Sequence, residues 1–213
     1  MTGEAGRDEA WRHRFPGFSV VGQADHWDPV TRDVVMARLE PPRPLRFMPE
    51  HLRPAAHAVV AQLIDADDEM AAGLLSSIDA RLDQDETDGY HFDDMPIDHE
   101  AWTRALTGLD EEARDRFSTG FADATHDQQH DLLDALATST DRSWHGMPPE
   151  KVFNLLLRYV CTAFYAHPSA WDEIGFSGPA YPRGYKNPGI NSTEPFEVSD
   201  AMPHMDPTVS SAP

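Results

Sequence analysis

Apolar residues recur every three or four positions through most of residues 47–167, which is the spacing of one face of an α-helix. The stretch that contains Leu52, Val59 and Leu63 is the first clear example. No comparable run alternates apolar and polar residues as a half-buried strand would. The pattern therefore predicts an all-α domain over approximately residues 47–167, an irregular bundle of about six helices. The helices are expected over residues 52–64, 74–82, 98–109, 110–121, 125–136 and 149–166.

Local signals mark several boundaries between these helices. Gly108 is expected to end the third helix, because glycine is common just past a helix C-terminus. Asp110 is a good N-cap for a fourth helix. Thr125 and Gln128 have the spacing of a capping box, in which each side chain bonds the backbone N–H group of the other residue. The fifth helix is therefore expected to begin directly after Thr125.

The run over residues 149–166 is apolar nearly all round. A helix of that kind is usually surrounded by other elements, so we expect it to be the central helix of the bundle. It contains Cys161, which is the only cysteine of the chain and cannot form an internal disulfide. We interpret Cys161 as a small core residue rather than a reactive thiol, because buried apolar cysteines are usually inert.

The two ends of the chain lack a sustained helical period. Residues 1–46 are expected to form an N-terminal arm that wraps over the main domain, with one short helix within residues 29–39 capped by Asp28 or Thr31. Four aromatic residues make this arm too apolar to stay in water, namely Trp11, Phe15, Phe18 and Trp27. Residues 186–213 are rich in proline, serine, threonine and acidic residues, and they predict a flexible tail.

The stretch from Tyr165 to Tyr185 is dense in proline, glycine and aromatic residues, and its charges are locally balanced. We expect a rigid loop that forms neither a helix nor a strand. Aromatic residues and arginine are enriched at protein interfaces, so the loop is predicted to contact a partner protein. The candidate contact residues are His167, Trp171, Phe176, Tyr181, Arg183 and Tyr185. In the alternative interpretation, these aromatic side chains fold back and cover the open end of the bundle.

The charge balance restricts the classes of partner. The chain has 17 Lys and Arg against 37 Asp and Glu, a net charge of −20, which argues against binding to nucleic acids or to anionic membrane surfaces. No apolar run approaches the roughly 20 residues that span a bilayer. Residues 1–14 lack the apolar stretch of a signal peptide. We therefore expect a cytoplasmic protein without direct membrane insertion, and attachment to the cell envelope through a partner stays open.

Eleven histidines raise the question of a metal site. His126 and His130 lie four residues apart on a predicted helix, a spacing that can chelate a metal ion. They are weak candidates, because a bundle metal site needs matching ligands from facing helices and the sequence has no Glu-x-x-His motif. His167 is interpreted as a protonated cap at the C-terminal end of the last helix, where a cation favours the helix dipole.

Motifs for nucleophilic catalysis and for phosphate binding are absent from the sequence. It has neither a Gly-x-Ser-x-Gly elbow nor the glycine patterns that cradle a nucleotide phosphate. We therefore predict no catalytic residues and no cofactor in this chain.

The C-terminal stretch nevertheless carries a motif. Trp171-Asp172-Glu173-Ile174-Gly175-Phe176, followed by Tyr181-Pro182-Arg183-Gly184-Tyr185, resembles the C-terminal signature of the gluconate 2-dehydrogenase subunit 3 family. The likeness extends upstream through Gly89-Tyr90, Gly108-Leu109, Phe121-Ala122 and Gln128, so it covers approximately residues 47–185.

This resemblance implies a non-catalytic small subunit of a dehydrogenase complex. The expected partner is a flavoprotein of the glucose-methanol-choline type, which holds FAD and oxidises a sugar or polyol, and such complexes can include a cytochrome c subunit. Family members often carry a twin-arginine export signal and assist the folding or export of the large subunit. No such leader precedes Trp11, so either the complex stays in the cytoplasm or the export role is lost.

Two other functions remain as alternatives. The first is a small metal-dependent bundle enzyme that uses His126, His130 and neighbouring acidic residues. The second is a stand-alone helical scaffold protein, whose C-terminal loop closes its own core.

Overall fold

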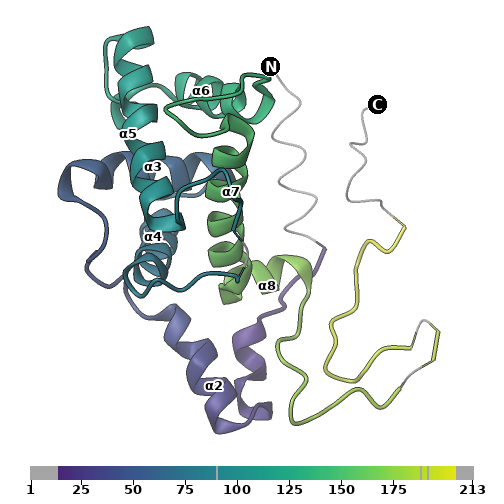
Figure 1. Cartoon of the computed structure of the whole chain (residues 1–213). Coiled ribbons are helices and arrows are strands. Elements are labelled where there is room, and N and C mark those ends of the chain that lie inside the picture. The colour runs from purple at the N-terminus through teal and green to yellow at the C-terminus, as the bar shows by residue number, and fades with distance from the viewer. Residues whose placement is uncertain (1–13, 90, 188, 191, 205–213) are drawn as a thin grey trace. The chain divides into compact units, whose positions relative to one another are not determined.

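The computed structural model describes residues 14–89, 91–187, 189–190 and 192–204. Within these residues the chain forms helices joined by turns and loops, without a β-strand, so the predicted all-α class is confirmed. The α-helices of this part are α2 (Pro29–Met36), α3 (Arg53–Ile64), α4 (Asp68–Asp83), α5 (Asp98–Phe117), α6 (His126–Thr138), α7 (Pro149–Ala166) and α8 (Pro168–Ile174) (Figure 1). Short 3₁₀ helices are η1 (Val20–His26), η2 (Ala37–Leu39), η3 (Glu50–Leu52) and η4 (Phe121–Asp123). Trp11 and Tyr90 lie outside the described residues.

The chain divides into two compact units. We call residues 41–164 the bundle unit, and residues 1–40 together with 165–213 the terminal unit. This division differs from the predicted boundaries at residues 46 and 185. The reason is that the C-terminal stretch packs with the N-terminal arm, as the contacts of Trp171 below show.

Helices α3 to α7 supply the core of the bundle unit (Figure 1). Helix α3 packs against α4, α5, α6 and η4, so α3 holds the central position that the sequence predicted for α7. Helix α7 buries one face, and Phe153, Leu157 and Cys161 on its other side are only partly buried. The largest fully buried side chains of this core are Trp102, Tyr159, Phe121, Met48 and Ile78.

The predicted break at Gly108 is wrong, because α5 runs without interruption from Asp98 to Phe117. Gly108 is buried within this helix, and a Cβ atom at this position would lie 2.6 Å from Cη2 of Trp144. The glycine therefore allows a close approach by the Trp144 ring instead of ending the helix. Asp110, the predicted N-cap, lies inside α5 and accepts a hydrogen bond from the Phe121 N–H at 2.9 Å.

Gly108→Ala is expected to destabilise the protein by about 1–3 kcal/mol, because the added methyl group overpacks the contact with Trp144. Gly73, inside α4, is a matched control, since a Cβ atom there meets nothing within 4 Å. Gly73→Ala should stabilise the protein by about 0.5–1 kcal/mol through helix propensity. Urea unfolding of both variants measures the difference. Equal effects of the two substitutions would show that Trp144 does not require the glycine.

Other helix boundaries follow local signals. Thr125 and Gln128 form the predicted capping box, with the Thr125 side chain accepting from the Gln128 N–H and the Gln128 side chain accepting from the Thr125 N–H. Buried Asp79 of α4 accepts backbone N–H groups in the same way, but from residues 46–48, which lie before η3 and form no helix. Its carboxylate accepts the N–H groups of Arg46 and Met48 at 2.6 and 2.7 Å, and also that of Phe47 at 3.2 Å. Asp79 thus fixes the chain that leads into η3.

The terminal unit has a small core of its own. Val20, Trp27, Val35 and Trp171 are buried against one another, with Phe18, Val21 and Ala24 packed around them. Two glycines of the C-terminal stretch make these contacts possible, because a Cβ atom at Gly175 would lie 2.6 Å from the Phe15 ring, and one at Gly178 would lie 2.4 Å from the Trp27 ring. The aromatic residues of the described arm therefore pack on the C-terminal stretch.

The expectation that this stretch contains no helix is wrong, because Pro168–Ile174 forms α8. Pro168 occupies its first turn, where the missing N–H group costs no hydrogen bond. Gly175 ends the helix in the left-handed conformation, with φ of 68°. Both signals are present in the sequence, but the density of proline and glycine obscured a helix of only seven residues.

Candidate functional site

The six predicted contact residues of the C-terminal stretch divide into inward-facing and outward-facing side chains. Trp171 is inward, with an exposed fraction of 7%. Its Nε1–H group donates to the Tyr165 carbonyl oxygen at 2.7 Å, and its ring meets the Phe176 ring edge to face at 5.2 Å. The guanidinium of Arg38 lies 5.6 Å from the Trp171 ring centroid. Trp171 thus closes the core of its own unit, the terminal unit.

Arg183 also makes contacts within the terminal unit. Its guanidinium donates to Gln23 Oε1 at 3.0 Å and to the Ser177 carbonyl oxygen at 3.2 Å. The same guanidinium lies 3.9 Å from the centroid of the Phe196 ring. Asp172, which the sequence analysis did not select, accepts a hydrogen bond from the Val20 N–H group at 2.5 Å. Asp172 therefore anchors the start of η1, and no local sequence signal reveals a partner 152 residues away.

His167 caps the following helix rather than the preceding one. Its Nδ1 atom accepts from the Ser169 N–H group at 3.3 Å and lies 2.6 Å from the Ser169 hydroxyl. An accepting Nδ1 must be unprotonated there. Burial lowers the pKa of His167 below its ordinary value of 6.5, and the positive charge of Arg38 lowers it further, against a smaller opposite effect of Asp172. The predicted protonated cap is therefore wrong, because the site favours the neutral ring.

A pH dependence follows from this lowered pKa. The folded state favours neutral His167, so its contribution to stability is present above pH 6.5 and is lost as the pH falls through the lower pKa of the folded state. His167→Asn keeps an N-cap acceptor but does not titrate. Denaturant unfolding from pH 8 to pH 5 should show the wild type losing stability relative to this variant. Parallel curves for the two proteins would contradict the assignment.

The outward-facing side chains give the terminal unit an apolar surface. Tyr181, Tyr185 and Phe176 have exposed fractions of 69%, 64% and 39%. Ten large apolar side chains are exposed among the described residues, and nine of them belong to the terminal unit. These nine are Val30, Val34, Leu39, Tyr165, Ile174, Phe176, Tyr181, Tyr185 and Ile190. We call this set the exposed apolar set; the tenth residue is Ile97 of the bundle unit.

The bundle unit, which has few exposed apolar side chains, carries most of the negative charge. The sequence of the terminal unit has 7 Lys and Arg against 13 Asp and Glu, and that of the bundle unit has 10 against 24, which together make the 17 and 37 of the whole chain. The net charges are therefore −6 and −14. Removing carboxylates from water on association costs free energy. A surface with fewer carboxylates around its apolar groups therefore associates at a lower cost. The terminal unit is thus the better suited of the two to bind another protein.

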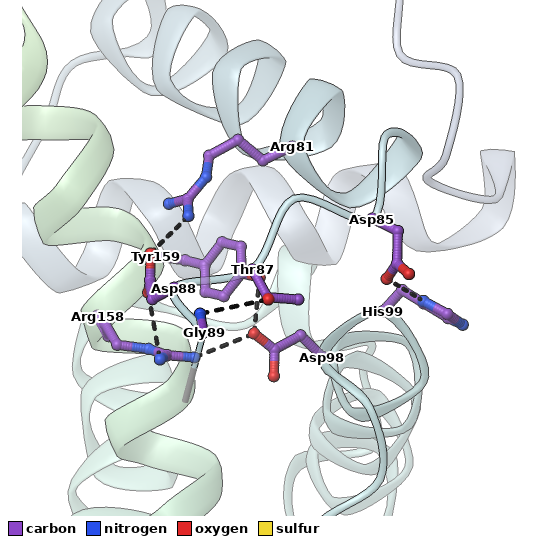
Figure 2. A network of polar contacts seen from close by, with 9 residues as sticks. All are labelled: Arg81, Asp85, Thr87, Asp88, Gly89, Asp98, His99, Arg158 and Tyr159. Atoms are coloured by element: carbon purple, nitrogen blue, oxygen red, sulfur yellow. Dashed lines mark hydrogen bonds and ion pairs between the residues drawn. The ribbon is translucent and has the colours of Figure 1, made fainter. Parts of the chain in front are cut away.

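A polar network in the bundle unit is the second cluster of functional groups (Figure 2). Asp88, in the loop after α4, pairs with Arg81 of α4 at 2.7 Å and with Arg158 of α7 at 3.2 Å. Asp98, at the start of α5, accepts from Arg158 Nη2 at 3.0 Å and from the Tyr159 hydroxyl at 2.8 Å. The network therefore connects α4, α5, α7 and the segment directly after α4 that contains Asp88.

The contacts of Tyr159 indicate that the network stabilises the packing of the helices it connects. Burial raises the pKa of Tyr159 well above its usual value, and the hydrogen bond to Asp98 adds to that effect, so Tyr159 keeps its proton and remains a donor. The guanidinium of Arg81 lies 5.0 Å from the Tyr159 ring centroid. The sequence analysis treated Asp98 only as a helix start signal. A hydrophobic pattern could not reveal its partners, which lie 60 and 61 residues further along the chain.

The weak metal candidates lie apart from this network. His126 and His130 are both exposed on α6, and His126 Nδ1 is 3.9 Å from an oxygen of Asp127. No group of three or more His, Cys, Asp or Glu side chains is placed to hold a metal ion in the part of the chain that the structure describes. Burial raises the pKa of the Cys161 thiol, which disfavours the nucleophilic thiolate. Over the same described residues, no helix is long and apolar enough to cross a membrane.

Comparison with known proteins gives one match. The family model described as gluconate 2-dehydrogenase subunit 3 matches residues 50–178, which include α3 to α8. The match ends before Tyr181, Arg183 and Tyr185, and it begins after α2. No curated protein and no solved structure matches the chain.

Proposed function

Because the chain belongs to the gluconate 2-dehydrogenase subunit 3 family, we propose that it is the non-catalytic small subunit of an FAD-dependent sugar or polyol dehydrogenase. Its partner would be a flavoprotein subunit that carries the FAD and performs the oxidation. The chain would bind the native form of the flavoprotein and not its unfolded form, which stabilises the native form by mass action.

The exposed apolar set of the terminal unit is the observation that carries this proposal. Exposed large apolar side chains are concentrated in this unit, and concentrations of this kind commonly mark sites of protein–protein contact. Among the described residues of the terminal unit, four apolar side chains form the buried core cluster, whereas nine large ones are exposed. Trp171 and Arg183 hold the stretch from inside, so Tyr181 and Tyr185 are presented from a defined support. Such preorganisation lowers the entropy cost of binding.

Co-expression with a candidate flavoprotein tests the proposal. The chain is expected to co-purify with the flavoprotein and to increase the amount of soluble, flavin-loaded enzyme. The double variant Tyr181→Ser/Tyr185→Ser should lose most of this effect, because both rings are exposed, and we expect it to keep the fold. Ile97→Ser is the control, since Ile97 is also a large, exposed apolar residue but lies in the bundle unit.

Two results would contradict the proposal. The first is a wild-type chain that neither co-purifies with the flavoprotein nor raises its soluble, flavin-loaded yield. The second is an equal loss of binding in the tyrosine double variant and in Ile97→Ser, which would show that the terminal unit has no special role.

A further inference from the structure

A groove with a volume of about 850 Å³ lies within the terminal unit. Three short segments form its walls, over residues 16–18, 183–187 and 194–198, and Gln23 and His26 complete it. The groove includes the residues on both sides of Tyr185, and the Tyr185 ring lies 6.0 Å from the ring of Phe196, which lines the groove. It is therefore continuous with the surface that we assign to partner binding.

The two carboxylates of the groove are engaged by the backbone of its own walls. Glu194 is buried and accepts the N–H groups of Lys186 and of Asn187, the latter at 2.6 Å. Glu197 accepts the N–H group of Glu194 at 2.6 Å. These hydrogen bonds connect residues 186 and 187 with residues 194–197, so both carboxylates have a structural role.

The two cations of the groove, Arg183 and Lys186, have no carboxylate partner among the residues that the structure describes. Arg183 donates only to neutral oxygens, those of Gln23 and Ser177, while its guanidinium rests on the Phe196 ring. Among the described residues, the Lys186 ammonium has no hydrogen bond and no ion pair, and its side chain is exposed. Within the described part of the chain, the groove thus holds two cationic side chains that form no direct contact with a carboxylate.

We propose that this groove receives a carboxylate from an acidic side chain of the flavoprotein subunit, which pairs with the ammonium of Lys186 beside Arg183. The inference rests on the proposed function and adds the chemistry that the partner must present. A protein carboxylate is favoured because the groove is continuous with the exposed tyrosines, so one partner surface can cover both. The chain is acidic overall, so the attraction is local and should be a modest part of the binding energy.

The lysine content of the chain permits a direct test. It has two lysines, Lys186 in the groove and Lys151 in the bundle unit, where Lys151 pairs with Asp94 at 2.6 Å. Zero-length carbodiimide cross-linking of the purified complex joins an amine to a carboxylate in contact with it. We expect mass spectrometry to find Lys186 joined to an Asp or Glu of the flavoprotein, and Lys151 joined to Asp94 of its own chain.

Substitutions of the two lysines provide the quantitative arm. Lys186→Gln should weaken the complex roughly twofold to fivefold, the range of an exposed charge pair, whereas Lys151→Gln should leave the affinity unchanged. If the complex forms but Lys186 cross-links only within this chain or to nothing, and Lys186→Gln binds like the wild type, the inference is wrong while the proposed function stands. Displacement of the Lys186 cross-link by free citrate, without loss of the complex, would also overturn it and indicate a site for small acids. Absence of any complex would reject both proposals.

Discussion

Replacing Asp98 with alanine is expected to lower the free energy of unfolding by about 2–4 kcal/mol, because it removes the buried member of a partly buried ion pair and the acceptor of a buried hydroxyl. Asp98 is 8% exposed and receives hydrogen bonds from Arg158 and Tyr159. Without its carboxylate, the buried Tyr159 hydroxyl loses its acceptor, which alone costs about 1–3 kcal/mol. Arg158 would keep only Asp88, in the loop after α4. Denaturant unfolding followed by circular dichroism measures the loss.

Asp94→Ala is the matched control for this experiment. Asp94 also pairs with a cation of α7, Lys151, but it lies on the surface, where solvent weakens the pair. Asp94→Ala should therefore be close to the wild type in stability. Asp98→Asn should fall between the wild type and Asp98→Ala, because it retains an oxygen for Tyr159 but no charge for Arg158. Near wild-type stability of Asp98→Ala would show that the network does not hold the helices together.

Trp171→Ala is expected to have the second large effect, a loss of about 3–5 kcal/mol confined to the terminal unit. Trp171 is one of four buried side chains in that core, and it also carries the contacts with Phe176 and Arg38. A loss of this size is comparable to the stability of a small domain. The described arm over residues 15–39 should then lose its packing and exchange its amide hydrogens rapidly.

Hydrogen exchange monitored by mass spectrometry separates this local effect from a global one. In Trp171→Ala, peptides from residues 15–39 should exchange much faster, while those of α3 to α6 should keep their protection, because their core lies in the bundle unit. Tyr181→Ala is the control, since the Tyr181 ring is mostly exposed and its removal should leave exchange of the arm unchanged. Unchanged exchange of residues 15–39 in Trp171→Ala would refute the role assigned to this residue.

Elements whose signals are local were predictable from the sequence. The Thr125 capping box lies within four residues, and α7 has both the predicted start and the predicted end. The apolar period also identified α3 and α4, although α4 begins at Asp68, before its first predicted residue. These features need only a short stretch of chain, because helix caps and amphipathic faces depend on neighbouring residues.

Features that depend on distant residues were missed or misread. Glycine often ends a helix, which is why Gly108 was predicted to end one. Its observed role is to leave room for the ring of Trp144, which lies 36 positions further along the sequence. Asp98 and Arg158 form a pair across 60 residues, and Asp172 bonds Val20 across 152. The packing of the described arm on the C-terminal stretch likewise depends on contacts between segments that are far apart in the sequence. An apolar period says which face of a helix is buried, but not which segment covers it.

The candidate site has features of both kinds, some with local sequence signals and some that depend on distant residues. The proline, glycine and aromatic content of the C-terminal stretch marked it as a candidate site. The family match over residues 50–178 includes this stretch as far as residue 178. It could not divide the six predicted contact residues into those that face inward and those that face outward. That division depends on the packing of Trp171 with Val20, Trp27 and Val35 from the arm. The outward-facing Phe176, Tyr181 and Tyr185 stay predictions as partner contacts.

The most direct test of the central claim is hydrogen exchange of the chain alone and in its complex with the flavoprotein. We predict slower exchange on binding in the terminal unit, in peptides that contain residues 29–39 and 174–187, where the exposed apolar set lies. Peptides from α4 and α6 of the acidic bundle unit should not change. Protection confined to α4 and α6, with no change around Tyr181 and Tyr185, would contradict the account.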